Sequence, residues 1–261
     1  MAEVVILPGG PEEARAAAGE LAAGLVEKVV RTRADAVLGL ATGSTPLTIW
    51  RALAARGLDL SRVRGFALDE YVGLPPGHPE SYRSVITREV VEPLGLTPAL
   101  VHVPGDDGGP VATAGTRYEA AIAAAGGVDL QVLGIGRTGH IGFNEPGSSF
   151  ASRTRTKTLT EATRRDNARF FSSLDEVPRH CLTQGLGTIL EARSLVLLAF
   201  GEAKAEAVAG AVEGPVSASL PGSAIQLHPE VTVLLDEAAA SRLRFADYYR
   251  YAWEHRPDWT R

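Results

Sequence analysis

Short apolar runs alternate along the chain with longer stretches in which apolar residues recur every three or four positions. The short runs predict strands at Glu3–Leu7, Ala36–Leu40, Val63–Leu68, Leu130–Ile135, Leu195–Phe200 and Val231–Leu235. The longer stretches predict helices at Glu12–Thr32, Ala112–Ala125 and Lys204–Val212. Continuous apolar runs are typical of parallel strands buried on both faces. The alternation therefore predicts an α/β fold with a doubly wound, mostly parallel sheet and helices on both faces.

The composition is that of an ordinary globular protein. Of 261 residues, 45% are hydrophobic and 22% are charged, which excludes disordered and collagen-like chains. No internal repeat or Ser/Gly-rich linker stands out, so residues 1–261 are predicted to form a single domain. The net charge of −5 gives no basic field for nucleic acid.

The sequence also bears on redox chemistry and location. Cys181 is the only cysteine, so no intramolecular disulfide and no Cys-cluster zinc site can form. Apolar runs fall well short of the roughly 20 residues that span a bilayer. The N-terminus lacks the basic start and long apolar segment of a secretory signal. We expect a cytoplasmic protein with no membrane partner and no metal.

Ligands of doubly wound folds bind beyond the carboxyl ends of the strands, so the residues that follow each predicted strand are informative. Thr42-Gly43-Ser44-Thr45-Pro46 follows the second strand and precedes a helix that is predicted to begin near Leu47. Ser44 and Thr45 are good helix caps and Pro46 suits the first helical position. The turn is either a simple helix cap or a phosphate cradle of N–H groups and hydroxyls. It matches neither a P-loop nor a dinucleotide fingerprint.

Two adjacent carboxylates, Asp69 and Glu70, follow the third strand and precede Tyr71. They are either solvated loop charges or the site of a base. A partly buried carboxylate at this place would have a raised pKa and could remove a proton from a substrate.

The richest segment, residues 136–147, follows the fourth strand. Its glycines let the backbone approach a ligand closely. His140 and Glu145 lie five positions apart in what is predicted to be a curled loop. A carboxylate bonded to one imidazole nitrogen fixes the tautomer and raises the basicity of the ring, which favours a catalytic pair. Metal binding is the competing interpretation, but two ligands are too few.

Basic residues are nearly all arginine, with Lys28, Lys157 and Lys204 as the exceptions. Lys204 opens a predicted helix, where the dipole disfavours a cation, and a bound phosphate would supply a reason. Alternating cations and hydroxyls at residues 152–157 form either a solvated face or a second anion pocket.

Together these motifs resemble the glucosamine-6-phosphate deaminase family. The matching blocks include ATGSTP, LDEYVGLPPGHPESYRS, LGIGRTGHIGFNEPGSSFASRTRTKTLT and SAIQLHPEVTVLLDE, and they run from Ala41 to Glu237. Related 6-phosphogluconolactonases share the fold but lack the DEYVGL and GHIGFNEP blocks. The resemblance implies a Rossmann-like fold with a lid segment. It also implies conversion of glucosamine 6-phosphate and water to fructose 6-phosphate and ammonia, without a cofactor.

The resemblance also assigns roles to residues. The phosphate-binding residues of the family fall on Thr42, Gly43, Ser44, Thr45, Arg169 and Lys204. The general base falls on Asp69, the ring-opening histidine on His140 and its acidic partner on Glu145. Many members carry Asp or Asn two residues before the histidine, where this chain has Thr138. We therefore expect His140 to rely mainly on Glu145.

A second site is implied by the allosteric members, in which N-acetylglucosamine 6-phosphate binds between subunits of a hexamer. The matching positions are Ser148, Ser149, Arg155 and Lys157. All four side chains can bind an anion, so an effector site in a homo-oligomer, a hexamer by resemblance, is predicted.

Three other functions stay open at this point. The chain could act on another amino-sugar phosphate, since Thr138 departs from the family pattern. It could hydrolyse phosphorylated sugar lactones, although that reaction needs no base at C2 such as Asp69. It could be a sugar-phosphate sensor without activity, although Asp69, His140 and Glu145 are all retained.

Overall fold

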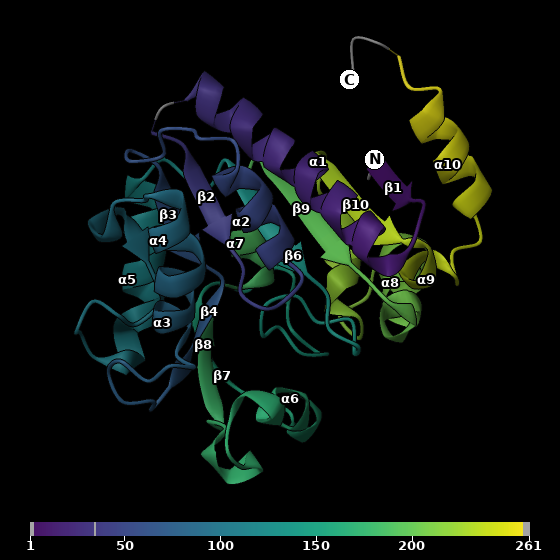
Figure 1. The fold of residues 1–261 in the computed structure, drawn as a ribbon. Helices are drawn as coiled ribbons and strands as arrows, with labels where there is room; N and C mark the ends of the chain where they lie inside the picture. The colour runs from purple at the N-terminus through teal and green to yellow at the C-terminus, as the bar shows by residue number, and fades with distance from the viewer. Residues whose placement is uncertain (1–2, 34, 258–261) are drawn as a thin grey trace.

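The computed structural model describes residues 3–33 and 35–257. Its centre is a sheet of seven parallel strands (Figure 1). Across the sheet the strands are β1 (Glu3–Leu7), β10 (Val231–Asp236), β9 (Ser194–Ala199), β6 (Leu130–Gly134), β2 (Val37–Leu40), β3 (Arg64–Ala67) and β5 (Val101–His102). Each of the six predicted strands is confirmed to within one residue at either end. The two-residue β5 has no apolar run and was not predicted.

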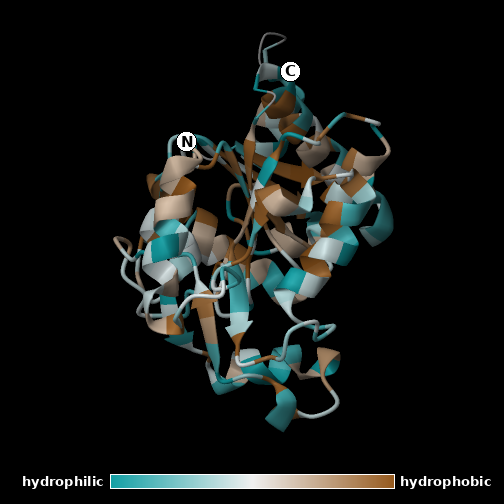
Figure 2. Cartoon of the chain, turned by 90° about the vertical axis from the view of Figure 1, so that its left-hand side faces the viewer, coloured by the Kyte–Doolittle hydropathy of each residue, from teal (hydrophilic) through white to brown (hydrophobic). Residues whose placement is uncertain are grey.

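Helices cover both faces of this sheet, and the apolar strands lie between them (Figure 2). The longer helices are α1 (Pro11–Thr32), α2 (Leu47–Ala54), α5 (Val111–Ala124), α8 (Ala205–Val212) and α10 (Ala246–Glu254). The shorter ones are α3 (Tyr82–Ile86), η1 (Thr87–Val91), α4 (Glu92–Leu94), η2 (Pro98–Leu100), α7 (Leu186–Leu190), η5 (Glu202–Lys204), η6 (Pro221–Leu227) and α9 (Glu237–Ala240). None of the helices in the described part of the chain is long and apolar enough to cross a membrane.

The strand order places a switch point in the middle of the sheet. From β2 the chain moves outward through β3 to β5, and from β6 it moves in the opposite direction through β9 to β10. The loops that leave β2 and β6 therefore diverge to opposite sides. A crevice opens at such a point and is the expected ligand site of this fold class.

A second sheet was missed by the sequence patterns. It consists of β4 (Asp69–Val72), β8 (His180–Thr183) and β7 (Arg155–Thr158), all antiparallel. Asp69 was expected in a loop after the third strand, but it begins β4. The polar β7 has the sequence RTKT, without an apolar run to mark it.

The register of the small sheet sets its rows of side chains. Asp69 pairs with Thr183, and Thr183 pairs with Arg155 on its other side. Directly opposed residues share a face of a sheet. The expected base and a candidate effector residue thus lie in one row, two strand spacings or roughly 10 Å apart.

Between β7 and β8 the chain forms a projection below the small sheet (Figure 1). It contains α6 (Glu161–Asn167), η3 (Ala168–Phe170) and η4 (Leu174–Glu176). We call residues 159–179 the lid, because they project from the small sheet between β7 and β8. An apolar cluster of Tyr71, Phe143, Leu159 and Cys181, with Phe171 packed against it, joins the lid to β4 and to the loop after β6.

Candidate active site

The predicted site residues follow neighbouring strands at one edge of the central sheet. Lys204 follows β9, His140 follows β6, the turn at residues 41–46 follows β2, and Asp69 follows β3. Because β9, β6, β2 and β3 are parallel neighbours, their carboxyl ends meet at this edge. The fold thus brings together four motifs that lie far apart in the sequence.

The turn after β2 differs from its prediction in one respect. Helix α2 begins at Leu47 as expected, but Pro46 is the N-cap and no side chain caps the helix. Ser44 and Thr45 therefore do not act as caps, which leaves their hydroxyls for a ligand. Gly43 and Ser44 are exposed, and Thr42 is half-buried. Free N–H groups and hydroxyls at a helix N-terminus suit a phosphate.

A chain of polar contacts connects this turn to the lid. The side chain of Thr42 is close enough to the Tyr82 hydroxyl to offset part of the rise that burial causes in the pKa of Tyr82. The Tyr82 hydroxyl lies 3.5 Å from that of Tyr71, to which Asn167 donates over 2.9 Å. Asn167 ends α6 and lies two residues before Arg169 in the sequence. The lid position of Arg169 is thereby tied to the turn.

Asp69 is a buried carboxylate with 8% of its surface exposed. Its pKa is raised to about 8, first by burial and second by the negative charge of Glu70, and no hydrogen bond from the described residues counters this. Gly142, in the loop that carries His140, lies against Asp69, since an added Cβ there would be 3.5 Å from Oδ2. The buried-base interpretation of Asp69 therefore fits better than the solvated one.

Glu70 has a different task. Its carboxylate accepts hydrogen bonds from the backbone N–H groups of Tyr71, Tyr82 and Arg83, at 2.7, 2.9 and 2.8 Å. These bonds hold the start of α3 against β4. Burial raises the pKa of Glu70, and the three N–H donors partly offset this.

The loop after β6 curls so that His140 folds back over Gly136. The N–H of Gly136 donates to the carbonyl of His140 over 2.9 Å, and the N–H of Gly139 donates to Gly136 over 3.0 Å. A Cβ at position 136 would lie within 2.1 Å of the imidazole ring, so only glycine fits there. The predicted curl of this loop is confirmed.

His140 has two polar partners on one side of its ring. Thr138 Oγ1 lies 2.8 Å from Nδ1, and Glu145 Oε2 lies 3.6 Å from the same nitrogen. Thr138 also donates to Glu145 Oε2 over 3.5 Å. The expectation that His140 relies mainly on Glu145 is therefore revised, because Thr138 is the nearer partner and bridges the two.

Glu145 is buried and ionised. Burial alone would raise its pKa, but the neighbouring His140 and hydrogen bonds from Thr163 and Thr160 outweigh that effect and lower it to about 2. An ionised carboxylate can only accept hydrogen bonds. The hydroxyl of Thr138 thus donates its hydrogen bond to Glu145 and accepts one from Nδ1–H of His140. This assigns the Nδ1–H tautomer to His140 and leaves Nε2 free to accept a proton.

Lys204 lies among further charges. Its pKa is lowered first by burial and then by Arg137 and Arg169, while Asp166 raises it. Arg137 Nε donates to Asp166 Oδ2 over 3.2 Å, and a second nitrogen of Arg137 contacts Oδ1. The predicted pair of Lys204 and Arg169 is brought together. Arg137 and Asp166 were missed, since nothing in their spacing links them.

The candidate effector residues lie beside this centre. Arg155 donates to Ser148 Oγ over 3.3 Å, and Ser148 Oγ donates to the carbonyl of Glu145 over 2.7 Å. Lys157 lies two positions after Arg155 in β7, on the same side of the strand. Ser149 is exposed and accepts from the N–H of Ala151. Arg155 is thus in contact with Ser148, and Ser148 connects Arg155 to Glu145.

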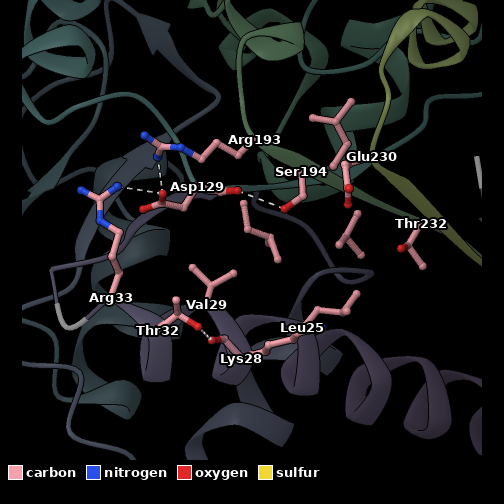
Figure 3. A pocket seen from close by; sticks show the side chains of 13 residues that line it. Leu25, Lys28, Val29, Thr32, Arg33, Asp129, Arg193, Ser194, Glu230 and Thr232 are labelled. Atoms are coloured by element: carbon pink, nitrogen blue, oxygen red, sulfur yellow. Dashed lines mark hydrogen bonds and ion pairs between the residues drawn. The ribbon is translucent and has the colours of Figure 1, made fainter. Parts of the chain in front are cut away.

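A cavity of about 640 Å³ lies at the other end of the sheet, away from all of these residues. Figure 3 shows Lys28 of α1 and the arginines Arg33 and Arg193 at its rim, with both arginines paired to Asp129. It lies at the amino ends of β6, β9 and β10 and contains none of the predicted site residues. No group of three or more metal-ligating side chains is found among the described residues.

Comparison with known proteins adds to this geometry. The sequence model described as glucosamine-6-phosphate isomerases/6-phosphogluconolactonase matches residues 10–234. The chain belongs to that family. A glucosamine-6-phosphate deaminase of Bifidobacterium longum is 58% identical over 99% of both chains. One of Pseudarthrobacter chlorophenolicus is 59% identical over 98% of both.

Solved structures of the glucosamine-6-phosphate isomerase/6-phosphogluconolactonase family agree with the fold. A monomeric glucosamine-6-phosphate deaminase superposes with a TM-score of 0.87 at 39% identity, over 93% of this chain and all of that one. The 6-phosphogluconolactonase of Leishmania guyanensis gives 0.71 at 21% identity, over 92% of this chain and 98% of that one. The second likeness concerns the fold alone. The Rossmann-like α/β fold predicted from the sequence is confirmed.

Proposed function

We propose that this chain converts glucosamine 6-phosphate and water to fructose 6-phosphate and ammonia. The observation that carries the proposal is the placement of Asp69, a buried carboxylate of raised pKa, against the loop that holds His140. An aldose-to-ketose conversion needs a base at C2. Hydrolysis of a lactone needs none, which makes that alternative a poor fit to Asp69.

His140 opens the sugar ring in this proposal. With Nδ1–H bonded to Thr138, the free Nε2 takes the proton of the C1 hydroxyl and delivers it to the ring oxygen. The buried negative charge of Glu145 stabilises the imidazolium that forms between these two transfers. The product is the open-chain aldehyde, whose carbonyl at C1 acidifies the proton on C2.

Asp69 then removes the C2 proton and returns it to C1. The intermediate is an enolamine, and protonation at C1 leaves an iminium at C2. Water adds to C2 and ammonia leaves, so the ketose forms with no net oxidation. A carboxylate of raised pKa holds the transferred proton well, and its burial keeps that proton from exchanging with solvent.

The phosphate of the substrate fixes the sugar in this site. Thr42, Gly43, Ser44 and Thr45 supply hydroxyls and N–H groups, and Arg169 and Lys204 supply positive charge. The contacts from Thr42 through Tyr82 and Tyr71 to Asn167 support this assignment, because they connect the turn with the lid segment that carries Arg169.

The test is release of ammonia from glucosamine 6-phosphate. We expect the wild type to release it and Asp69→Asn to lose at least two orders of magnitude in kcat. Release of gluconate 6-phosphate from its lactone, without ammonia, would favour the lactonase. Absence of both products would favour a sensor, and ammonia from a different amino-sugar phosphate alone would change the substrate.

Four further parts of the proposal rest on the sequence. They are a single domain, a cytoplasmic location, a homo-oligomer and activation by N-acetylglucosamine 6-phosphate at Ser148, Ser149, Arg155 and Lys157. The exposed aromatic residues Phe245, Tyr248 and Tyr251 support a contact surface between subunits. A relative of known structure is described as monomeric, so light scattering of the purified protein is the deciding measurement.

A further inference from the structure

An ion pair joins the loop after β6 to the lid. Arg137 lies in the loop that carries His140, and Asp166 lies in α6. The guanidinium uses two nitrogens on the two oxygens of the carboxylate. Both side chains are well exposed, at 58% and 38%. Exposed pairs of this kind stabilise a fold very little, so stability alone does not explain the arrangement.

The surroundings of this pair carry an excess of positive charge. Lys204 is half-buried, and Arg137, Arg169 and Asp166 all act on its charge. Of these four groups three are cations and only Asp166 is an anion, so the positive charges outnumber the negative one by two. A doubly charged anion such as the phosphate of a sugar phosphate would balance them.

The pairing with Asp166 shows that the guanidinium of Arg137 is placed to bind a group with two oxygens. A guanidinium presents its N–H groups in a planar fork that fits two oxygens of a carboxylate or of a phosphate equally well. Arg137 also lies directly before Thr138, the bridge between His140 and Glu145. A phosphate held by Arg137 would thus lie beside the ring-opening residues.

We propose that Arg137 is a third cationic ligand of the substrate phosphate and exchanges Asp166 for the phosphate when the substrate binds. This inference rests on the proposed function. Asp166 competes with the phosphate for Arg137. It holds the guanidinium in place, and it weakens phosphate binding because the ion pair must break first. When the exchange occurs, α6 loses this ion pair with the loop and keeps the hydrogen bond from Thr163 to Glu145, so phosphate binding is coupled to the lid.

The experiment compares Arg137→Ala with Asp166→Asn, because a phosphate ligand and a simple lid contact predict different results. Arg137→Ala should raise KM for glucosamine 6-phosphate about ten-fold or more, with kcat within about two-fold. Asp166→Asn frees Arg137 and should leave KM unchanged or lower it. Equal increases of KM in both variants would overturn the proposal, since the pair would then only hold the lid.

Arg165→Ala is the matched control. Arg165 belongs to α6, the helix that carries Asp166, and pairs with Glu161 within that helix. Arg165→Ala removes one positive charge, as Arg137→Ala does, but takes it from the lid and leaves the loop after β6 unchanged. We expect no change in KM. An increase of KM equal to that of Arg137→Ala would show that only the net positive charge around the site matters, and would overturn the proposal.

Binding of inorganic phosphate, measured by titration calorimetry, tests the inference without turnover. The wild type and Asp166→Asn should bind it, and Arg137→Ala should bind it about ten-fold more weakly. One outcome is that the three proteins bind phosphate as expected while the wild type releases no ammonia. In that case the proposed function fails and the role of Arg137 in phosphate binding stands. If Arg137→Ala binds phosphate as tightly as the wild type, the inference fails and the proposed function is untouched.

Discussion

The hydroxyl of Thr138 lies 2.8 Å from Nδ1 of His140 and nearer to that nitrogen than Glu145 does. Because Glu145 is ionised and can only accept, the hydroxyl passes the influence of the carboxylate to the ring. A neutral threonine thus bridges the two, and the geometry makes it a positioning residue for the proposed ring opening.

Thr138→Val should slow the reaction, because valine keeps the shape of threonine and removes the bridge. We expect kcat to fall about ten-fold, while KM changes little. Thr138→Asp places a charge beside His140 and should change both the rate and the pH profile. Thr156→Val, an exposed threonine of β7, is the control. Wild-type kinetics in both Thr138 variants would contradict the bridging role.

Asp69→Asn should stabilise the protein while it removes activity. The native pKa of Asp69 is about 8, above the unfolded value near 4, so the folded state binds this proton more tightly. The associated stability is complete below pH 4 and is lost as pH rises through 8. Asparagine does not titrate. The variant should therefore exceed the wild type in free energy of unfolding by on the order of a few kcal/mol at pH 8.5.

Urea unfolding at pH 5 and pH 8.5 measures this difference. The advantage of Asp69→Asn should be smaller at pH 5 than at pH 8.5. A difference that does not change between the two pH values would show that Asp69 titrates normally in the folded protein.

Lys204→Arg should raise KM several-fold. Burial is the main cause of its lowered pKa, and Arg137 and Arg169 already lie near it, so a larger guanidinium has little room. A compact ammonium and a planar fork also bind phosphate differently. Lys28→Arg makes the same exchange at the rim of the distant cavity and should be silent. Equal KM values in the two variants would show that lysine has no specific role at position 204.

The proposed effector site predicts a change in the substrate-saturation curve. N-acetylglucosamine 6-phosphate should shift the curve to lower substrate concentration, and Arg155→Gln should abolish that shift. The contacts from Arg155 through Ser148 to the carbonyl of Glu145 give the physical route. Arg165→Gln in the lid should respond as the wild type does. Identical hyperbolic curves with and without the effector would exclude activation.

The sequence by itself determined the central sheet and most of the proposed site. Six of its seven strands are continuous apolar runs that stand out from their neighbours, because they are buried on both faces, and only the two-residue β5 lacks such a run. The motifs at their ends were also visible, since glycines, hydroxyls and carboxylates interrupt the apolar pattern at Thr42, Asp69 and His140. The resemblance then assigned their roles.

The tertiary structure alone decided the contacts between distant segments. The small sheet was missed because β7 has a polar sequence, and its strands come from three separate parts of the chain. Arg137 and Asp166 are 29 positions apart, and no periodicity links them. Local pattern encodes which residues are buried, whereas an ion pair or a bridging hydroxyl depends on how loops meet above the sheet. For this reason the sequence shows Thr138 only as a departure from the family pattern, whereas the structure shows that its hydroxyl lies between His140 and Glu145.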